Sequence, residues 1–578
     1  MIPEVSGAWH VTIFLKFVKN YMRYILLCIS LIASEYLRAQ DVYFPAGSTG
    51  AYEYYRLFIT NADMLSRTDL ALNRFERAPM TRKTWCASCR LMHQHDSATQ
   101  DFRDYLSVEN NSQINRYSKS KKPFLKYFYK EKAFFYKYQQ KDENIFVINP
   151  VFNFTGGKES SSGATLYQNT RGAEIWGILG GRDKGVGFYT YFTENQVLLP
   201  TPYRYFTDSL NFVPNEFFFK PFKKQGAVDF FQARGYFTFN ALKDIIKFQF
   251  GHDKHKIGNG YRSLILSDFA PQYLFFKINT DLGRVHYQNL FTQFTDNGPI
   301  LSNILYGKKY GVFHRLSLDV HRNINIGLNE MVIFDRMDST QSNQFDLNYL
   351  NPVIFYRSIE SNLGSRDNSL MALDASWRIK NRFVVYGQFL LDEFNLNLIR
   401  SQPHWWANKY AGQIGVRAFD FLGVDRLDLL LEYNRCRPYT YSHKRPTQSY
   451  SHFNQPLAHP LGASFSEAVF EVRYKPGYKW FVNVTAIYAR TGGDSSLTGR
   501  NYGANILRSY DTRVTEFNSR MFMGKTQELM IGEFMLSYMV KHNLFIDARA
   551  NYRSYGASSV MFISLGLRLN CQARKFDY

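Results

Sequence analysis

Apolar and polar residues alternate along this chain with a period of two. Residues 246–251 place isoleucine and phenylalanine on one parity, and lysine, glutamine and glycine on the other. Because successive side chains of a strand point to opposite faces, this pattern predicts a strand with one apolar and one polar face. The polar residues 252–256 follow, and then Gly258 and Gly260, which together predict a tight loop after the strand.

The same alternation recurs from Ile145 onward. The runs 315–320 and 324–328 are separated by a short link and therefore predict a hairpin. Further alternating runs lie at residues 482–487 and 561–570. A soluble sandwich would alternate in the same way, so periodicity alone leaves the choice between a sandwich and a membrane barrel open.

The region before these strands has a different pattern. Residues 61–77 and 123–138 have apolar residues at spacings compatible with amphipathic helices, and the second segment is rich in lysine. We interpret residues 40–143 as a small, partly helical N-terminal periplasmic element that caps or plugs a barrel mouth. A flexible periplasmic leader is the alternative interpretation.

The first residues have the pattern of an export signal. Basic residues at positions 16–23 precede an apolar run at 24–33, and Ala39 precedes the expected cut before Gln40. This order predicts a signal peptide over residues 1–39, with Met22 as an alternative start. After residue 40 no run of eighteen apolar residues follows, so the exported chain is either soluble or inserted in an outer membrane as a barrel.

Composition, together with the export signal and the number of predicted strands, favours the membrane barrel over a soluble protein. Aromatic residues make up 17% of the 578 residues, with 41 Tyr and 51 Phe, and membrane barrels place such residues in girdles at both interfaces. Charged residues make up 21% and the mean hydropathy is −0.34, which argues against a helical membrane protein. We therefore predict an all-β fold, a transmembrane antiparallel outer-membrane β-barrel of about 18 strands over residues 144–578, located in the cell outer membrane.

Net charge indicates the chemistry of the partners. The formal charge is +21, which favours acidic partners. Export argues against nucleic acid and leaves outer-membrane lipid and lipopolysaccharide head groups, together with anionic surface polysaccharide. Excess lysine and arginine that only solvate surface loops are the alternative explanation.

Cysteine spacing singles out one short segment. Cys86 and Cys89 form a Cys-x-x-Cys pair with His93 and His95 close behind. The compact spacing does not match the long loop of a zinc finger, and Arg90 excludes the haem attachment sequence. In an oxidising compartment we expect a Cys86–Cys89 disulfide rather than a metal site, and we predict no cofactor.

Several polar and aromatic clusters interrupt the strands. Charged side chains on a membrane strand cannot face lipid cheaply, so we expect them to point into the lumen, where they either form a filling network or bind polysaccharide. For binding, aromatic rings would stack on sugar faces while charged and amide groups exchange hydrogen bonds with hydroxyls. The candidate polysaccharide-binding residues are His252, Asp253, Arg262, Arg357, Glu360, Asp367, Asn368, Trp405, Trp406, Lys409, Arg437, Tyr439, Tyr441, His443 and His459.

Patterns for catalysis are weak. Asp392 and Glu393 are adjacent, so on a strand they would point to opposite faces and could not act as a carboxylate pair. Ser464 lacks the Gly-x-Ser-x-Gly elbow of a hydrolase. His252 and His255 would also diverge on an extended strand. We therefore predict that the protein is not an enzyme.

Seven strings of the sequence resemble a known family. They are FGHDK at 250–254, GNGYRS at 258–263, LSDF at 266–269, NYLNPVIFYR at 348–357, WWANK at 405–409, RPYTYSH at 437–443 and LAHPLGA at 457–463. The chain from about Ile145 to Arg490 resembles the RemB-type gliding-motility proteins of the Bacteroidota, which in turn resemble the Wzi outer-membrane capsule-assembly proteins. The resemblance implies an outer-membrane barrel with a periplasmic helical element and a lectin-like or motility role.

We therefore expect an outer-membrane barrel that binds or organises surface polysaccharide and supports capsule assembly or gliding motility. One alternative is a structural component of motility or secretion machinery whose polar clusters only hold the barrel together. Another is a channel for small solutes, against which the expected filled lumen argues.

Overall fold

The computed structural model covers the strands and most of their connections. It describes residues 52, 55–56, 59–60, 136–140, 144–180, 185–222, 226–242, 245–296, 307–336, 344–351, 367–393, 401–494 and 499–578. The predicted signal peptide at 1–39, most of the N-terminal element at 40–143, and Cys86, Cys89, Arg357 and Glu360 lie outside the described residues.

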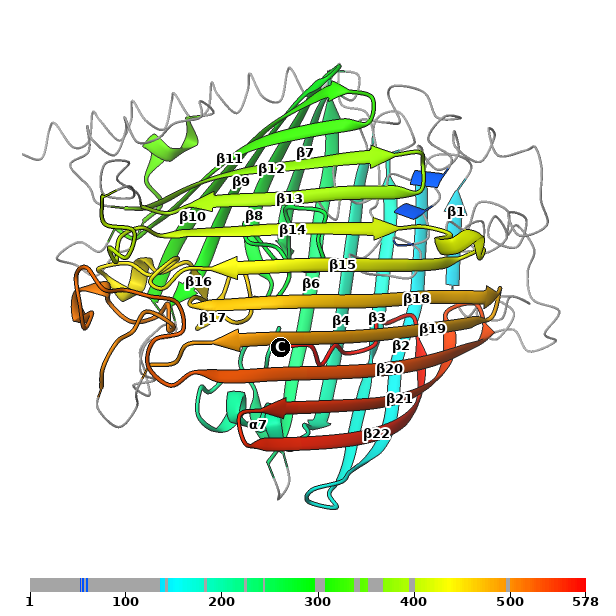
Figure 1. The fold of residues 1–578 in the computed structure, drawn as a ribbon. Helices are drawn as coiled ribbons and strands as arrows, with labels where there is room; N and C mark the ends of the chain where they lie inside the picture. Colours follow the sequence, from blue (N-terminus) through cyan, green and yellow to red (C-terminus); the bar gives the residue numbers. More distant parts are fainter. Residues whose placement is uncertain are drawn as a thin grey trace, which may run out of the picture.

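Eighteen antiparallel strands close on themselves as a barrel (Figure 1), which confirms the predicted fold class and strand number. Each strand pairs with its neighbour in sequence, and the first and last pair through Phe152 and Leu569 to complete the ring. The barrel strands are β2 (Asn144–Glu159), β3 (Thr165–Leu179), β4 (Val186–Leu198), β6 (Ala227–Ala241), β7 (Ile246–Asp253), β8 (Tyr273–Leu282), β9 (Val285–Asp296), β10 (Gly307–His321), β11 (Ile324–Phe334), β12 (Asn368–Ile379), β13 (Phe383–Leu391), β14 (Tyr410–Ala418), β15 (Leu427–Cys436), β18 (Phe465–Gly477), β19 (Trp480–Thr491), β20 (Gln527–Lys541), β21 (Leu544–Tyr555) and β22 (Ser558–Leu569).

Short elements complete the described chain. Strand β1 pairs with the start of β2, β5 pairs with β6, and β16 and β17 form a separate hairpin. None of the helices in the described ranges has the length and apolarity needed to span a bilayer. The short elements are β1 (Tyr136–Gln140), β5 (Lys220–Phe222), β16 (Ser451–His452), β17 (Gln455–Pro456), α7 (Thr201–Asp208), η3 (Leu347–Leu350), η4 (Phe421–Gly423), η5 (Pro446–Gln448) and η6 (Tyr510–Thr512).

The strand pairings test two local predictions. Leu316 pairs with Leu328 and Leu318 with Ile326, so the predicted hairpin is confirmed as β10 and β11. Residues 136–138, the end of the segment 123–138 that the sequence pattern predicts to be helical, instead belong to β1. The pairing of β1 with β2 supplies backbone partners that an isolated amphipathic segment does not have, and this tertiary context overrides the local pattern.

The two ends of the barrel have connections of different lengths. At one end, which we call the short-turn end, tight turns such as Tyr478–Lys479 join the strands, and β2 begins and β22 ends there. At the other, the long-loop end, the long connections 199–226, 254–272, 335–367, 392–409, 437–464 and 492–526 emerge. Bacterial outer-membrane barrels place short turns in the periplasm and long loops outside the cell.

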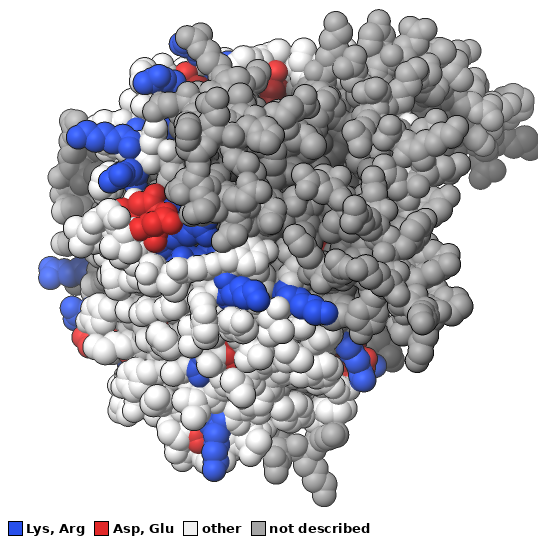
Figure 2. Space-filling view, turned by 90° about the vertical axis from the view of Figure 1, so that its right-hand side faces the viewer, with Lys and Arg blue, Asp and Glu red and all other residues white. Residues whose placement is uncertain are grey.

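Outward and inward faces differ as the alternation predicts. On β22, Ile563 and Leu565 point outward and are 55% and 63% exposed, while Arg568 on the other parity is buried at 6%. Figure 2 shows that uncharged residues predominate on one side of the barrel below the grey region, with lysine and arginine scattered over it. The outer wall is thus largely apolar, as a hydrocarbon environment requires.

The lumen is largely filled by chain segments. Residues 254–272 and 437–464 fold inward from the long-loop end, and Leu264, Tyr441 and Tyr450 are buried in the main core cluster. The C-terminal tail after β22 also turns into the barrel, and the chain end lies within it in Figure 1. Tyr578 packs on Tyr203 of α7 with ring centroids 5.3 Å apart.

Five described residues near the N-terminus are helical and lie against the turn between β14 and β15. Tyr52 donates a hydrogen bond of 2.8 Å to Asp428, and Arg56 pairs with Asp420 and with Asp428. Residues of the N-terminal element are therefore tied to the short-turn end of the barrel.

Candidate functional site

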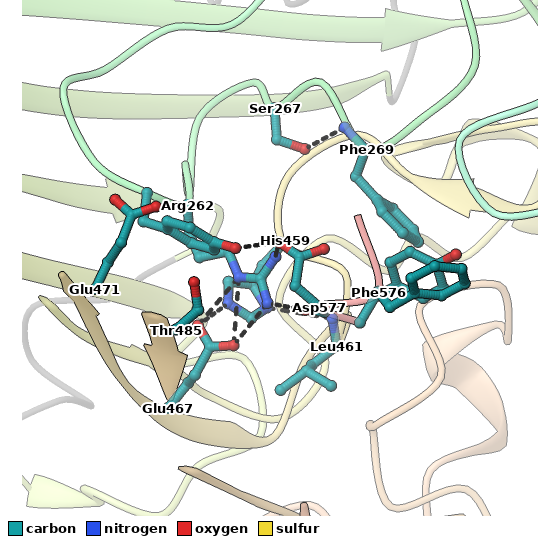
Figure 3. A network of polar contacts seen from close by, with 12 residues as sticks. Arg262, Ser267, Phe269, His459, Leu461, Glu467, Glu471, Thr485, Phe576 and Asp577 are labelled. Atoms are coloured by element: carbon teal, nitrogen blue, oxygen red, sulfur yellow. Dashed lines mark hydrogen bonds and ion pairs between the residues drawn. The ribbon is translucent and has the colours of Figure 1, made fainter. Parts of the chain in front are cut away.

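A buried ion-pair network joins the inward loops and the tail to the barrel wall (Figure 3). Arg262 lies at its centre, with Nη2 3.1 Å from Glu467 Oε1 and Nη1 3.3 Å from Asp577 Oδ2. His459 Nε2 lies 2.7 Å from Glu467 Oε2. These four residues come from the loop after β7, the wall strand β18, the C-terminal tail and the loop before β18, so one cluster ties four distant segments together.

The protonation of His459 follows from its contacts. The Leu461 backbone N–H donates to His459 Nδ1 at 3.2 Å, so Nε2 carries the proton and donates it to Glu467. Burial lowers the pKa of His459 below its usual value, although the neighbouring Glu467 raises it. Glu467 therefore accepts from a neutral imidazole and from the Arg262 guanidinium.

A second carboxylate fixes the backbone of the same loop. Glu432 of β15 accepts hydrogen bonds from the backbone N–H of Tyr261 at 2.7 Å and of Arg262 at 3.0 Å. It also accepts from the Tyr386 hydroxyl at 2.7 Å. Gln388 of β13 accepts from the Leu264 backbone N–H at 2.8 Å. The wall strands thus hold residues 261–264 inside the lumen through charged and amide side chains.

A cavity remains in the lumen beside this network. It has a volume of about 420 Å³ and lies between the tail and the wall. Its lining combines charged and aromatic side chains, among them Glu216, Arg234, Tyr261, Arg473 and Asp577. The lining includes Lys254 from a connection at the long-loop end and Arg426 from the short-turn end, and Tyr261 of the inward loop forms part of its wall.

A second cluster of aromatic and charged residues lies at the long-loop end. The indole N–H groups of Trp405 and Trp406 both donate to Glu516 Oε1, at 3.3 and 2.8 Å. The Trp406 ring packs against Tyr510 with centroids 4.8 Å apart, and the Arg513 guanidinium lies 4.3 Å above Trp406. We call Trp405, Trp406, Tyr510, Arg513 and Glu516 the aromatic cluster.

Arg513 also controls the charge of Glu516. Its guanidinium nitrogen lies 2.6 Å from Glu516 Oε2. Although partial burial opposes the effect, Arg513 and the two indole donors hold the pKa of Glu516 below its usual value. Glu516 therefore stays ionised and joins residues 401–409 to residues 499–526 at the long-loop end.

Lysine and arginine side chains border the aromatic cluster. Lys444 is 56% exposed and lies 3.2 Å from Asp511 of η6. Arg445 is 70% exposed and lies 3.7 Å from Asp335. His443 packs edge-on against Tyr510 at 5.9 Å. Each of these cations has a carboxylate partner, but exposed ion pairs are weak, so both side chains can be reached by an acidic ligand that approaches the aromatic cluster.

Most of the predicted polysaccharide-binding residues near this cluster are buried and hold loops together. Arg437 donates to the carbonyl oxygens of Asn408 at 2.8 Å and Ser519 at 3.1 Å, so it holds loops together. Tyr439 and Tyr441 are buried, and their hydroxyls donate to backbone carbonyls. Lys409 is buried beside Asp392 and lies 4.4 Å from the Tyr510 ring centroid.

The positions of Asp392 and Glu393 correct the prediction that their side chains point to opposite faces of a strand. Asp392 and Glu393 follow the end of β13, so they are not strand residues with opposed side chains. Both approach Lys409, at 3.6 and 3.1 Å. A bend after Leu391 removes the alternation on which the sequence argument depended.

The remaining candidates lie elsewhere in the barrel. His252, at the end of β7, stacks on Phe217 with centroids 5.6 Å apart, and Asp253 lies 3.8 Å from Arg234. Asp367 pairs with Arg336 at 2.7 Å, and the Asn368 side chain donates to the Gln448 carbonyl at 2.8 Å. The predicted set therefore divides into the lumen network, the surroundings of the aromatic cluster and these two separate groups.

Sequence reasoning missed the residues that complete the aromatic cluster. Tyr510, Arg513 and Glu516 come from the connection between β19 and β20, and Lys444 and Arg445 follow the predicted segment at 437–443. Basic and aromatic residues interleave at 508–513, a signal that sequence alone contains. What sequence does not contain is the distance of that segment from Trp405.

No family model and no curated protein matches this sequence. Among solved structures, the chain is similar to Escherichia coli Wzi, an outer-membrane carbohydrate-binding β-barrel involved in group 1 capsule assembly, with a TM-score of 0.53 and 13% identity over 93% of this chain and 100% of that chain. It is also similar to Pseudomonas aeruginosa OprD, with a TM-score of 0.38 and 8% identity over 73% of this chain and 94% of that one. The chain is similar as well to Acinetobacter baumannii OccAB2, with a TM-score of 0.41 and 8% identity over 73% of this chain and 97% of that chain.

The similarity to Wzi extends over nearly the whole chain, and at this identity it establishes the fold. The closed barrel and the class of its structural neighbours place the protein in the outer membrane, as predicted. The short-turn end is accordingly periplasmic and the long-loop end extracellular.

Proposed function

We propose that the protein binds surface polysaccharide with the loops at its extracellular end and thereby supports capsule assembly or surface motility. The observation that carries this proposal is the aromatic cluster, which is half-open at Trp405 and is bordered by the exposed cations Lys444 and Arg445. Rings that stack on sugar faces, beside charges that pair with acidic substituents, suit an anionic polysaccharide.

The filled lumen supports binding rather than passage. Residues 254–272 enter the barrel and are fixed there by Glu432, Glu467 and Gln388. A ligand that arrives from outside therefore meets a surface formed by loops. The carbohydrate-binding description of Wzi and the RemB-like strings of the sequence add capsule assembly and gliding motility, respectively, as the processes that such a surface would serve.

A binding screen with the purified full-length protein tests the proposal. Native protein in detergent is presented with acidic and neutral bacterial polysaccharides, and we expect retention of an acidic one that weakens as salt rises from about 0.1 to 1 M. The triple variant Trp405→Ala, Lys444→Gln, Arg445→Gln should bind about tenfold more weakly. Trp406 is left intact because it is buried and its loss would disturb the loop.

A matched control uses cations at the opposite end. Arg322 and Lys380 are exposed in periplasmic turns, so Arg322→Gln with Lys380→Gln removes the same charge without touching the extracellular loops. This control should bind like the native protein. A folded native protein that retains none of the polysaccharides, or a triple variant with native affinity, would favour a structural component of motility or secretion machinery instead.

A further inference from the structure

A large hollow opens in the apolar outer wall formed by the described strands. It has a volume of about 760 Å³ and extends across strands β13 to β21. Its rim is formed by large exposed side chains, among them Ile414 at 62%, Leu431 at 55% and Met530 at 46%. Tyr433, Phe470, Tyr488 and Tyr552 complete the rim.

Strand register explains why the wall is hollow there. Outward-facing side chains of paired strands form rows around the barrel, and two neighbouring rows place small residues beside large ones. In the first row, Ala468 pairs with Tyr433 and Tyr488. In the second row, Ala486 pairs with Phe470 and Gly532. A Cβ built on Gly532 would meet nothing within 4 Å. Because aromatic and long aliphatic side chains stand around these small residues, the floor lies deeper than the surrounding wall.

Two arginines lie directly above the hollow on the extracellular side. Arg435 and Arg490 are exposed and both pair with Ser466 of β18, so they flank one strand in the next outward row. Strand spacing places their Cα atoms about 10 Å apart. Neither forms an ion pair within the described part of the chain, and Arg490 lies 4.9 Å from the Phe522 ring centroid.

One acid, Glu528, lies beside these arginines and keeps its negative charge. Glu528 of β20 pairs with Arg490 in the strand register, and its carboxylate is hydrogen-bonded by Tyr488. The opposite wall provides a contrast, because Arg171 of β3 lies 3.1 Å from Glu194 and is neutralised there. Two arginines beside one carboxylate leave a net positive charge in the outward row next to the hollow, toward the extracellular end of the wall.

We propose that this hollow and the two arginines form a binding site for the phosphorylated glycolipid of the outer leaflet, lipopolysaccharide. Acyl chains occupy the hollow over Ala468, Ala486 and Gly532, while the phosphate groups of the lipid accept hydrogen bonds from Arg435 and Arg490. Guanidinium groups suit this role because they donate two parallel hydrogen bonds to phosphate oxygens. The site lies on the lipid-facing wall and does not depend on polysaccharide binding by the loops.

Binding of purified lipid A tests the site. The full chain is delipidated in detergent, and its affinity for diphosphorylated and dephosphorylated lipid A is measured by native mass spectrometry. We expect the native protein to prefer the diphosphorylated form. The double variant Arg435→Gln, Arg490→Gln should lose that preference and bind about tenfold more weakly. Ala486→Leu should also weaken binding, because the added side chain fills the hollow.

Matched variants separate this site from general effects on the wall. Ala548→Leu adds the same volume to the outer face of β21 outside the hollow, and Arg171→Gln removes a paired arginine on the opposite wall. Both should bind lipid A like the native protein. The proposal is overturned if Arg435→Gln with Arg490→Gln retains native affinity, if Ala548→Leu weakens binding as much as Ala486→Leu, or if phosphatidylglycerol binds as tightly as lipid A.

Discussion

The lumen network and the aromatic cluster contain similar residue types but differ in their access to water. In the lumen network, the Arg262 and Glu467 side chains are 8% and 0% exposed and each charge is paired. Beside the aromatic cluster, Lys444 and Arg445 are 56% and 70% exposed. The comparison teaches that polar and aromatic residues in a barrel hold the chain together where they are enclosed, and are available to a ligand where a loop leaves them open.

Removing the C-terminal tail should have the largest effect on the enclosed region. A chain that ends at Cys571 loses the Asp577–Arg262 ion pair and the buried Phe576 and Tyr578 side chains. Burial of two aromatic side chains contributes roughly 3–6 kcal/mol, so the thermal midpoint in detergent should fall markedly. Loss of the tail should also widen the cavity that it lines, so planar-bilayer recordings should show a larger conductance for the truncated chain than for the native protein.

The exposed Lys575 provides the control for the tail. Lys575→Gln alters the tail without removing its buried rings, so both the thermal midpoint and the conductance should stay native. Equal thermal midpoints for the truncated and native chains would contradict a structural role for the tail.

A pair of single substitutions compares the two regions directly. Glu467→Ala leaves the buried Arg262 without its closest carboxylate, and breaking such a buried pair costs about 3–5 kcal/mol. Glu516→Ala breaks a pair with Arg513 whose side chains are 42% and 24% exposed, and such pairs contribute about 1 kcal/mol or less. The thermal midpoint in detergent should therefore be much lower for Glu467→Ala than for Glu516→Ala. The reverse order would contradict the distinction between an enclosed and an exposed ion pair.

Lowering the pH should destabilise the inward loops, by less than the truncation or the Glu467→Ala substitution. Burial lowers the pKa of His452 to about 3 and that of His443 to about 4. The unfolded chain, with a histidine pKa of about 6.5, therefore binds more protons than the folded chain from about pH 6.5 down to about pH 3 for His452 and about pH 4 for His443. Stability from these histidines is present above pH 6.5 and is lost as pH falls through that window.

His452→Gln isolates this contribution. His452 Nδ1 accepts from the Thr295 backbone N–H at 2.9 Å and Nε2 donates to the Gln272 carbonyl at 3.2 Å, roles that an amide side chain can also fill. The thermal midpoint of this variant should fall less between pH 7 and 4 than that of the native protein. An identical pH profile for the two proteins would show that His452 does not contribute.

The alternation of residues was sufficient to predict much of the wall. Runs such as 324–328 and 561–570 show one apolar and one polar face because a strand in lipid must separate them, and this periodicity is local. Predicting a closed barrel also required the export signal and the aromatic content, and the strand number followed from chain length. The strand β1 and the bend at Asp392 were predicted wrongly, because pairing partners and a local turn decided them.

Sequence also identified many residues of the site without assigning their surroundings. Arg262 and His459 stood out as polar groups in unusual places, and so did Trp405 and Trp406. Their partners lie far away in the chain: Asp577 for Arg262, and Glu516 for both indoles. No local sequence pattern shows that these residues lie close together in the folded chain.

The sequence by itself determined which side of each strand meets an apolar environment, because side-chain alternation depends only on neighbours along the backbone. Only the tertiary structure decided which loops enter the lumen, that the tail follows them, and that Arg435 and Arg490 stand together above a hollow. The physical reason is that these features depend on strand register and on contacts between distant segments, which arise only when the barrel closes.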